Sequence, residues 1–210
     1  MIVAGECIDV SDSMDKELLS VTEDVKEKQR RNGWTGTKAG STAYKVALVG
    51  LMVAFIEVCK IVMMNIPNVE MTTFLLIMFT LFFGKLVLFV VPVFILIEGV
   101  MFGFGLWWIM YLYVWPLLVL VTWLLRKQES VWVWSLVAGA FGLLYGFFCS
   151  FPYFFIGAVD GGLVGGFSMA FSWWIAGIPW DLVHGASNFV FMLALYKPMR
   201  RILLRTSEIL

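Results

Sequence analysis

Three polar side chains interrupt the apolar C-terminal third of this sequence. Asp181, His184 and Asn188 are spaced by three and four residues, so they share one face if the stretch is helical. A carboxylate beside an imidazole can work as an acid–base pair, and all three groups can bind the polar parts of a ligand. His184 is the only histidine of the chain, so a metal site built on two histidines is excluded.

Charged residues also lie inside two other apolar stretches. Glu57 and Lys60 are three residues apart, so they can share one helix face and pair, and Glu98 lies in a further stretch. A charge at the centre of a membrane costs on the order of 3 kcal/mol, so each one needs a reason. At 1.5 Å per residue, Glu57, Glu98 and Asn188 fall at about one depth in the outer half of a membrane. The sequence thus predicts a polar layer to which three helices contribute.

These groups belong to a strongly hydrophobic chain. Of its 210 residues 61% are hydrophobic and 14% are charged, against about 25% charged residues in soluble domains. Residues 1–45 hold eight of the fifteen acidic and seven of the fifteen basic residues. The chain is therefore predicted to have a polar cytoplasmic arm, residues 1–42, and an all-α membrane domain, residues 43–205. The net charge of zero averages two unlike regions and points to no nucleic-acid partner.

The arm has one periodic pattern. Met14, Leu18, Val21 and Val25 recur at helical spacing among charged residues, which favours a short amphipathic helix on the membrane surface or on a partner. A disordered tail is the alternative. The first residues lack a basic start and a long apolar core, so no cleavable signal peptide is expected.

Six apolar stretches predict membrane-spanning helices. They are residues 44–64, 70–84, 86–104, 111–125, 131–150 and 181–199. Residues 158–178 are also apolar, but their Gly pairs and the prolines around them favour a folded-back loop or a re-entrant segment. With six spans and both termini in the cytoplasm, eleven Lys and Arg residues lie inside and only Lys60 lies near the outside. The predicted fold is a six-helix bundle that crosses the cell membrane several times.

Aromatic residues are frequent in the connections predicted to lie outside. Together with the polar layer, they predict a ligand pocket that opens outward, although such rings also form the interfacial belt of membrane proteins. The sequence contains no HExxH, GxSxG or Walker motif and no acidic cluster for a divalent metal. No catalytic residue, metal or cofactor is therefore predicted.

A stripe of small residues runs along the first predicted span. Ala43, Ala47, Gly50 and Ala54 are spaced by four, three and four residues. Small residues let another helix approach closely. That helix belongs either to the same bundle or to a second membrane protein.

The order of these motifs resembles the S-components of energy-coupling factor (ECF) transporters, the vitamin-importing branch of the ABC transporters. The resemblance covers about residues 43–205. It rests on the six short spans, the Ala43-xxx-Ala47 motif, the "IPNVE" turn and the ending "IPWDLVHGASNFVFMLALYKP". It implies a subunit without its own ATPase that binds a vitamin-like molecule from outside. Such a subunit associates with a transmembrane coupling subunit and two ABC ATPases, and topples in the lipid bilayer to release its ligand inward.

The resemblance also implies site residues. Ala43 and Ala47 match the motif that contacts the coupling subunit, and Gly50 continues the same stripe. Pocket residues would come from the outer ends of the spans and from the first, third and fifth connections. With the polar layer included, the predicted ligand-binding residues are Glu57, Lys60, Asn68, Glu70, Glu98, Trp107, Trp108, Tyr111, Tyr153, His184 and Asn188. The aromatic rings suit a flat ligand, and riboflavin, folate, thiamine and the corrin ring of cobalamin all remain open.

Two other functions fit parts of the sequence. A membrane sensor or scaffold would signal through the charged arm, residues 12–31. An intramembrane enzyme would use His184 as an acid or base beside Asp181.

Overall fold

The computed structural model describes residues 42–209, with side chains to Leu204, and in the N-terminal region only Ser20 and Glu23. The chain divides into two compact units, residues 40–199 and residues 1–39 together with 200–210. In the second unit, Ser20, Glu23 and the end of the last helix are helical. The apolar positions of the amphipathic helix predicted between residues 14 and 25 lie outside the described residues.

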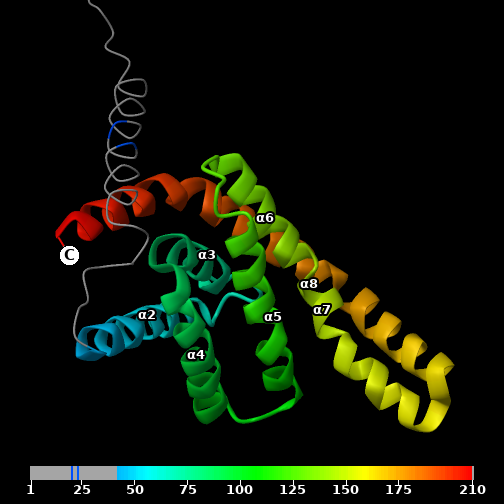
Figure 1. Ribbon diagram of the computed structural model, residues 1–210. Helices are drawn as coiled ribbons and strands as arrows, with labels where there is room; N and C mark the ends of the chain where they lie inside the picture. The colour runs from blue at the N-terminus through cyan, green and yellow to red at the C-terminus, as the bar shows by residue number, and fades with distance from the viewer. Residues whose placement is uncertain (1–19, 21–22, 24–41, 210) are drawn as a thin grey trace, which may run out of the picture. The chain divides into compact units, whose positions relative to one another are not determined.

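All regular structure of residues 42–209 is helical, and no strand occurs among them (Figure 1). The prediction of an all-α chain is confirmed for this part. The elements are α2 (Thr42–Met63), α3 (Thr72–Phe83), the 3₁₀ turn η1 (Gly84–Leu86), α4 (Val87–Phe102), α5 (Leu106–Leu124), α6 (Val131–Leu143), α7 (Tyr145–Cys149) and α8 (Phe151–Ile209).

The first five predicted spans each match helical structure. Two differences concern their bounds: α5 begins at Leu106, because the aromatic stretch before residue 111 continues the helix, and the span at 131–150 is interrupted at Leu144. α3 has 12 residues, about 18 Å of helix, which is shorter than the roughly 30 Å core of a bilayer.

Of the two alternatives for residues 158–178, the folded-back loop is wrong, because this region is a helical hairpin, and the re-entrant segment agrees with its helical conformation. α8 reverses at Gly162, whose φ of 59° lies in the left-handed region that glycine adopts without a steric penalty. The two arms then run side by side, as the yellow and orange ribbons of Figure 1 show, and Tyr153 stacks on Trp173 with 4.7 Å between ring centroids. Gly161 and Gly162 form the turn, and Gly165 and Gly166 allow the close packing, because a Cβ atom at either would lie 2.7 Å from a backbone oxygen of the first arm.

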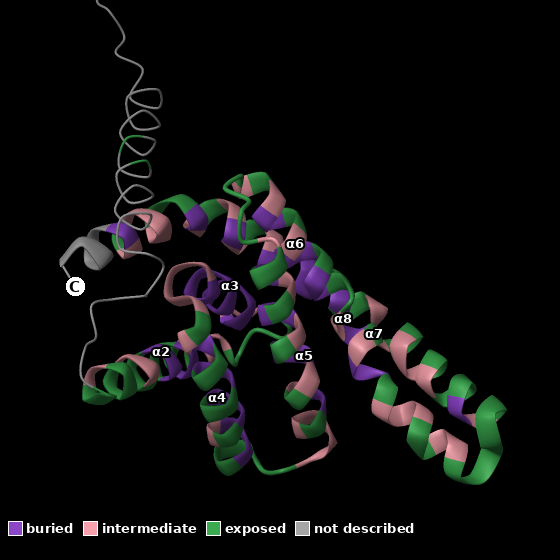
Figure 2. Cartoon of the chain, in the orientation of Figure 1, coloured by how far each residue is buried: buried purple, intermediate pink, exposed green. Residues whose placement is uncertain are grey.

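The core of the 40–199 unit surrounds α3. Residues 72–80 are all buried, and α2, α4, α5 and α6 contact this helix (Figure 2). A helix that is apolar on every side needs such an enclosure. The N-terminus of α3 is consequently held in place between the other helices.

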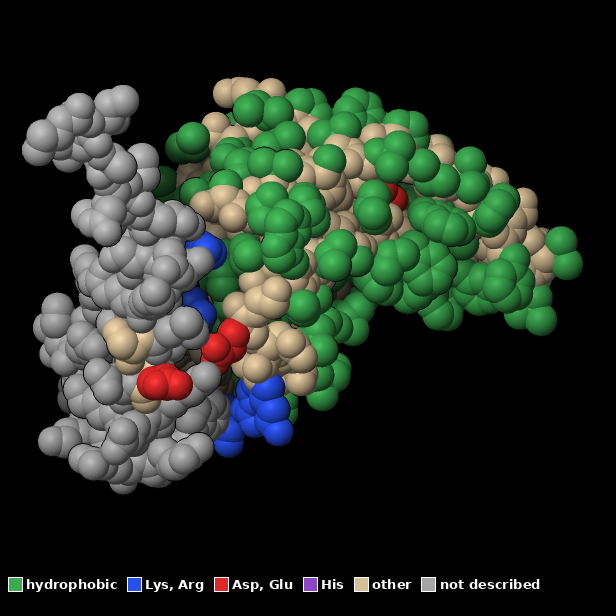
Figure 3. All heavy atoms as spheres, turned by 90° about the horizontal axis from the view of Figure 1, so that it is seen from above, with side chains coloured by type: hydrophobic (Ala, Val, Ile, Leu, Met, Phe, Trp, Pro, Cys, Tyr) green, Lys and Arg blue, Asp and Glu red, His purple; other side chains and the backbone are tan. Residues whose placement is uncertain are grey.

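The outer faces of the helices are apolar. Leu51 on α2, Phe89 on α4 and Val164 on α8 are 67%, 66% and 82% exposed, and hydrophobic side chains cover most of the coloured surface in Figure 3. Four helical stretches are long and apolar enough to cross a bilayer: Thr42–Met63, Thr72–Phe102, Leu106–Leu124 and Tyr145–Leu204. These features are compatible with a helix bundle in a membrane.

Candidate ligand-binding site

A cavity of about 430 Å³ lies where the C-terminal ends of α2 and α4 meet the N-terminal ends of α3 and α5. This volume is in the range of small-molecule sites. The connection between α2 and α3 forms one side of it, and α7 and α8 complete the wall. Seven of the residues predicted to bind ligand line it: Lys60, Asn68, Glu70, Glu98, Trp107, Tyr111 and His184.

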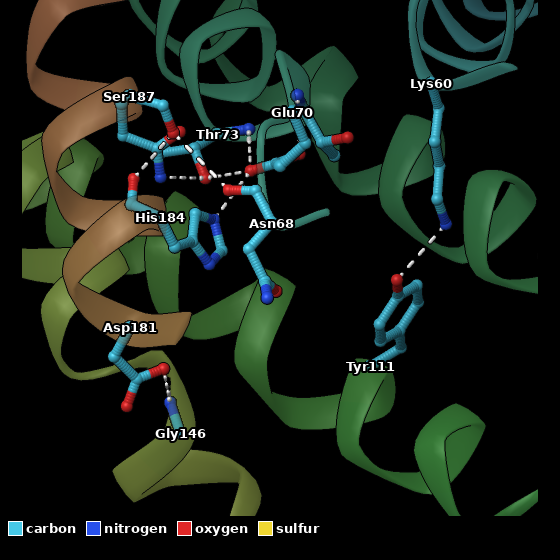
Figure 4. Close-up of polar contacts among 11 residues, drawn as sticks. Lys60, Asn68, Glu70, Thr73, Tyr111, Gly146, Asp181, His184 and Ser187 are labelled. Atoms are coloured by element: carbon cyan, nitrogen blue, oxygen red, sulfur yellow. Dashed lines mark hydrogen bonds and ion pairs between the residues drawn. The ribbon is translucent and has the colours of Figure 1, made fainter. Parts of the chain in front are cut away.

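Lys60 forms an ion pair with Glu98 of α4 instead of the pairing with Glu57 that their spacing allows. The reason is the packing of α2 on α4, which brings Glu98 to the end of the Lys60 side chain. Lys60 Nζ also donates a hydrogen bond of 3.1 Å to the Tyr111 hydroxyl (Figure 4) and lies 5.0 Å from the centre of that ring and 5.7 Å from the Phe94 ring. The charge of this partly buried lysine is thereby compensated by a carboxylate and aromatic faces.

Glu57 is placed behind the cavity wall. Its carboxyl group lies next to that of Glu98, only 7% of the residue is exposed, and neither carboxyl oxygen has a hydrogen-bond donor among the described residues. Glu57 therefore belongs to the same cluster as Lys60 and Glu98, although it does not line the cavity.

A second polar cluster forms at the N-terminus of α3. The Glu70 carboxylate accepts hydrogen bonds from the backbone N–H groups of Thr72 at 2.7 Å and Thr73 at 3.2 Å, and from the Thr73 hydroxyl at 2.7 Å. His184 Nε2 lies 3.1 Å from Glu70 Oε1 (Figure 4). Burial alone raises the pKa of Glu70, but the hydrogen bonds from His184, Thr72 and Thr73 outweigh it and lower this pKa to about 2. Glu70 is thus a carboxylate that caps α3 and holds His184.

Asn188 and Ser187 connect α8 to this cluster from outside the cavity. Asn188 is fully buried, and its Nδ2 donates to Thr73 Oγ1 at 3.2 Å. The Ser187 hydroxyl lies 3.0 Å from the His184 carbonyl oxygen and 3.4 Å from that of Asn68 (Figure 4). Asn188 was predicted to bind ligand; it does not line the cavity and instead contacts Thr73, whose hydroxyl donates to the lining residue Glu70.

Asp181 and His184 have separate partners. Asp181 Oδ1 accepts a 3.0 Å hydrogen bond from the backbone N–H of Gly146, which ties α7 to α8. His184 instead contacts Glu70 and packs against the Tyr145 ring, with 4.8 Å between centroids. The polar face of α8 is therefore divided between a helix–helix contact and the cavity wall.

Two predicted aromatic residues lie elsewhere. Trp108 donates its ring N–H to the Ile95 carbonyl at 2.8 Å, so it joins α5 to α4. Tyr153 lies in the α8 hairpin against Trp173. The expectation that the fifth connection contributes to the pocket depended on a loop. In the hairpin, Tyr153 packs on Trp173 of the other arm, and Trp174 packs on Phe147 of α7.

Sequence reasoning missed several lining residues. Thr72, Trp115 and Tyr145 all face the cavity. Trp115 and Tyr145 lie inside predicted spans, where aromatic residues are ordinary core residues. Thr72 follows Glu70 by two residues, and an acid just before a helix start is the one signal that could have marked it.

The small-residue stripe of α2 faces away from the bundle. Ala43, Ala47, Gly50 and Ala54 are all exposed, and a Cβ atom built at Gly50 meets nothing within 4 Å. The stripe therefore does not serve packing among the described helices.

Among the described residues, no group of three or more His, Cys, Asp and Glu side chains is placed to hold a metal ion. Comparisons with protein-family models, with curated proteins and with solved structures gave no match to this chain. The functional assignment therefore rests on the cavity and its lining.

Proposed function

We propose that this chain is a multi-pass protein of the cell membrane that binds a small molecule in the cavity. The observation that carries the proposal is the meeting of the Lys60–Glu98 pair and the Glu70–His184 pair on the wall of one cavity. These groups come from separate segments of the chain. Placing ionisable side chains inside an apolar bundle costs free energy, so their presence there favours a functional role such as ligand binding.

The lining defines the class of ligand. Trp107, Tyr111, Trp115 and Tyr145 offer ring faces and edges, while the Lys60–Glu98 ion pair offers charge of both signs and the Glu70–His184 contact offers polar atoms. Such a wall suits a ligand with a flat ring system and polar substituents. A vitamin-like micronutrient meets this description.

We place the cavity at the outer surface, with both chain termini in the cytoplasm and six spans. Lys45 precedes most of α2, Lys85 precedes α4 and Arg126 follows α5, so these basic residues lie at the helix ends remote from the cavity. The positive-inside rule supports this orientation. In this arrangement the tip of the α8 hairpin, near Gly162, lies on the outer side.

The proposed role is that of the substrate-binding subunit of an ECF-type importer. The subunit would act with a transmembrane coupling subunit and two ABC ATPases. The exposed stripe of Ala43, Ala47 and Gly50 supports a close contact with another membrane helix. Ala47→Trp is expected to leave ligand binding intact and to abolish assembly with the coupling subunit. If the complex still assembles, the stripe is not the contact.

The test is to purify the chain without any ATPase from cells grown in rich medium and to identify retained small molecules by mass spectrometry. One compound is expected at near-stoichiometric amounts. Val69→Trp fills the cavity wall and should remove it, whereas Val58→Trp, on the exposed side of α2, should not. Absence of any bound compound, together with no binding across a panel of vitamins, contradicts the proposal.

A further inference from the structure

The cluster of Glu57, Lys60 and Glu98 contains more acidic charge than its one basic side chain neutralises. Glu57 and Glu98 are 7% and 1% exposed; Glu57 precedes Lys60 by three residues on α2, and Glu98 of α4 is the ion-pair partner of Lys60. Lys60 is the one basic side chain that contacts them in the described part of the chain, and it pairs with Glu98 Oε2. With both acids ionised, the cluster carries one uncompensated negative charge inside an apolar bundle.

Three carboxyl oxygens of this cluster have no donor. They are Glu57 Oε1, Glu57 Oε2 and Glu98 Oε1, and no hydrogen bond reaches them from the described residues. Buried carboxylate oxygens without donors are strongly disfavoured, because the solvation lost on burial is not replaced. The buried cluster thus lacks a hydrogen-bond donor, and one proton held by the two acids would supply it.

The surrounding elements offer no other group that fills this place, as far as the described residues extend. From α5, the Tyr111 hydroxyl faces Lys60 and accepts its hydrogen bond. Across the cavity, Glu70 is already satisfied by Thr72, Thr73 and His184. The excess charge therefore stays with the two acids.

We propose that Glu57 and Glu98 form a proton-binding site on the wall of the cavity. One proton bonds to a carboxyl oxygen of Glu57 and is donated to Glu98 Oε1, while Glu98 Oε2 keeps Lys60. The proton comes from a hydronium ion in the water that enters the cavity: one O–H bond of hydronium breaks, one O–H bond to the carboxyl group forms, and a neutral water molecule is left. The three-residue cluster then has no net charge. Because Glu98 lines the cavity, the proton decides whether this wall presents a neutral or a negative surface to a ligand.

This inference goes beyond the proposed function and is tested without any ligand. Dicyclohexylcarbodiimide modifies carboxyl groups that are protonated in apolar surroundings. The detergent-solubilised full chain is treated from pH about 5 to about 10, and the modified peptides are quantified by mass spectrometry. We expect Glu57 or Glu98 to be modified, with the yield falling about tenfold per pH unit once the proton dissociates.

Two variants examine whether the acids act as a pair. In Glu98→Gln or Glu57→Gln, one carboxylate remains to neutralise Lys60, so the remaining acid should lose its modification. Asp160→Asn, which removes an acid near the hairpin tip, is the matched control and should leave the yield unchanged. The pH series on the unaltered chain decides the outcome even if a variant fails to fold.

Three results overturn the proposal. The first is no modification of either acid at any pH. The second is an unchanged yield in Glu98→Gln, which means that Glu57 holds its proton alone. The third is a modification yield that falls when sodium, but not potassium, is added at constant pH, because a sodium ion would then occupy the site of the proton. None of them affects the proposed binding of a small molecule, which is measured separately.

Discussion

The cavity wall and the α8 hairpin, residues 151–180, are both rich in aromatic residues but use them differently. At the cavity, Trp115 is 2% exposed and Tyr111 holds Lys60, so the rings enclose charged groups from several helices. In the hairpin, Phe155 and Phe167 are 69% and 67% exposed. Aromatic content alone therefore does not mark a binding site. What marks it is ionisable side chains from separate helices that share one enclosed space.

The largest effect is expected from removing the cation of the cavity wall. Lys60→Leu leaves Glu98 buried without its partner, which costs about 3–5 kcal/mol of stability. Asp160→Leu, near the hairpin tip, should change stability little. Thermal unfolding in detergent measures both. Equal effects would remove the distinction between the two regions.

Glu70→Gln should destabilise the chain by roughly 1.5–3 kcal/mol at neutral pH, because charge-assisted hydrogen bonds to α3 and His184 are weakened. The pKa of Glu70 is lowered to about 2 in the folded chain, so its contribution is complete above its ordinary pKa and is lost as the pH falls toward 2.

The measurement is the difference in unfolding temperature between the unaltered chain and Glu70→Gln as a function of pH. This difference should shrink from pH about 5 downward. A difference that does not depend on pH would show that Glu70 acts only through its shape.

A smaller effect is expected where α6 approaches α8. A Cβ atom at Gly142 would lie 2.8 Å from the backbone of Gly185, so Gly142→Val should cost about 1–3 kcal/mol. Gly177 lies on the returning arm of the hairpin, where a Cβ atom would meet nothing within 4 Å, and Gly177→Val is the matched control. If both variants unfold alike, the tight packing beside His184 is not specific to the cavity region.

The smallest effect belongs to the hairpin itself. Trp173→Leu removes the stacking on Tyr153 and should cost about 0.5–1.5 kcal/mol, with ligand affinity unchanged. The unfolding temperature of Trp173→Leu measures the loss of stability, and a ligand titration measures whether its affinity is unchanged. A loss of affinity comparable to that of a cavity variant would mean that the hairpin takes part in binding.

The helices were largely predictable from the sequence, because long apolar stretches bounded by charged residues rarely form any other secondary structure. For the hairpin the sequence left a loop and a re-entrant segment open, because two apolar helical arms joined at Gly162 have the composition of a glycine-rich loop. A positive φ at one glycine cannot be inferred from composition.

The sequence identified many residues of the candidate site but not which side chains they contact. Charges in apolar stretches singled out Lys60, Glu98 and His184, all of which line the cavity. Pairing by spacing along one helix assigned Lys60 to Glu57, because the sequence does not show that α4 packs beside α2. Asn188 and Tyr153 were misplaced for the same reason, since their partners lie on other segments.

Ligand binding at the cavity is tested most directly by titrating the compound identified by mass spectrometry into three proteins. These are the unaltered chain, the cavity variant Val69→Trp and the hairpin variant Trp173→Leu, each checked for an unchanged helix content. The account predicts that Val69→Trp loses at least about tenfold in affinity, equivalent to about 1.4 kcal/mol, while Trp173→Leu binds like the unaltered chain. Unchanged affinity in Val69→Trp would contradict it.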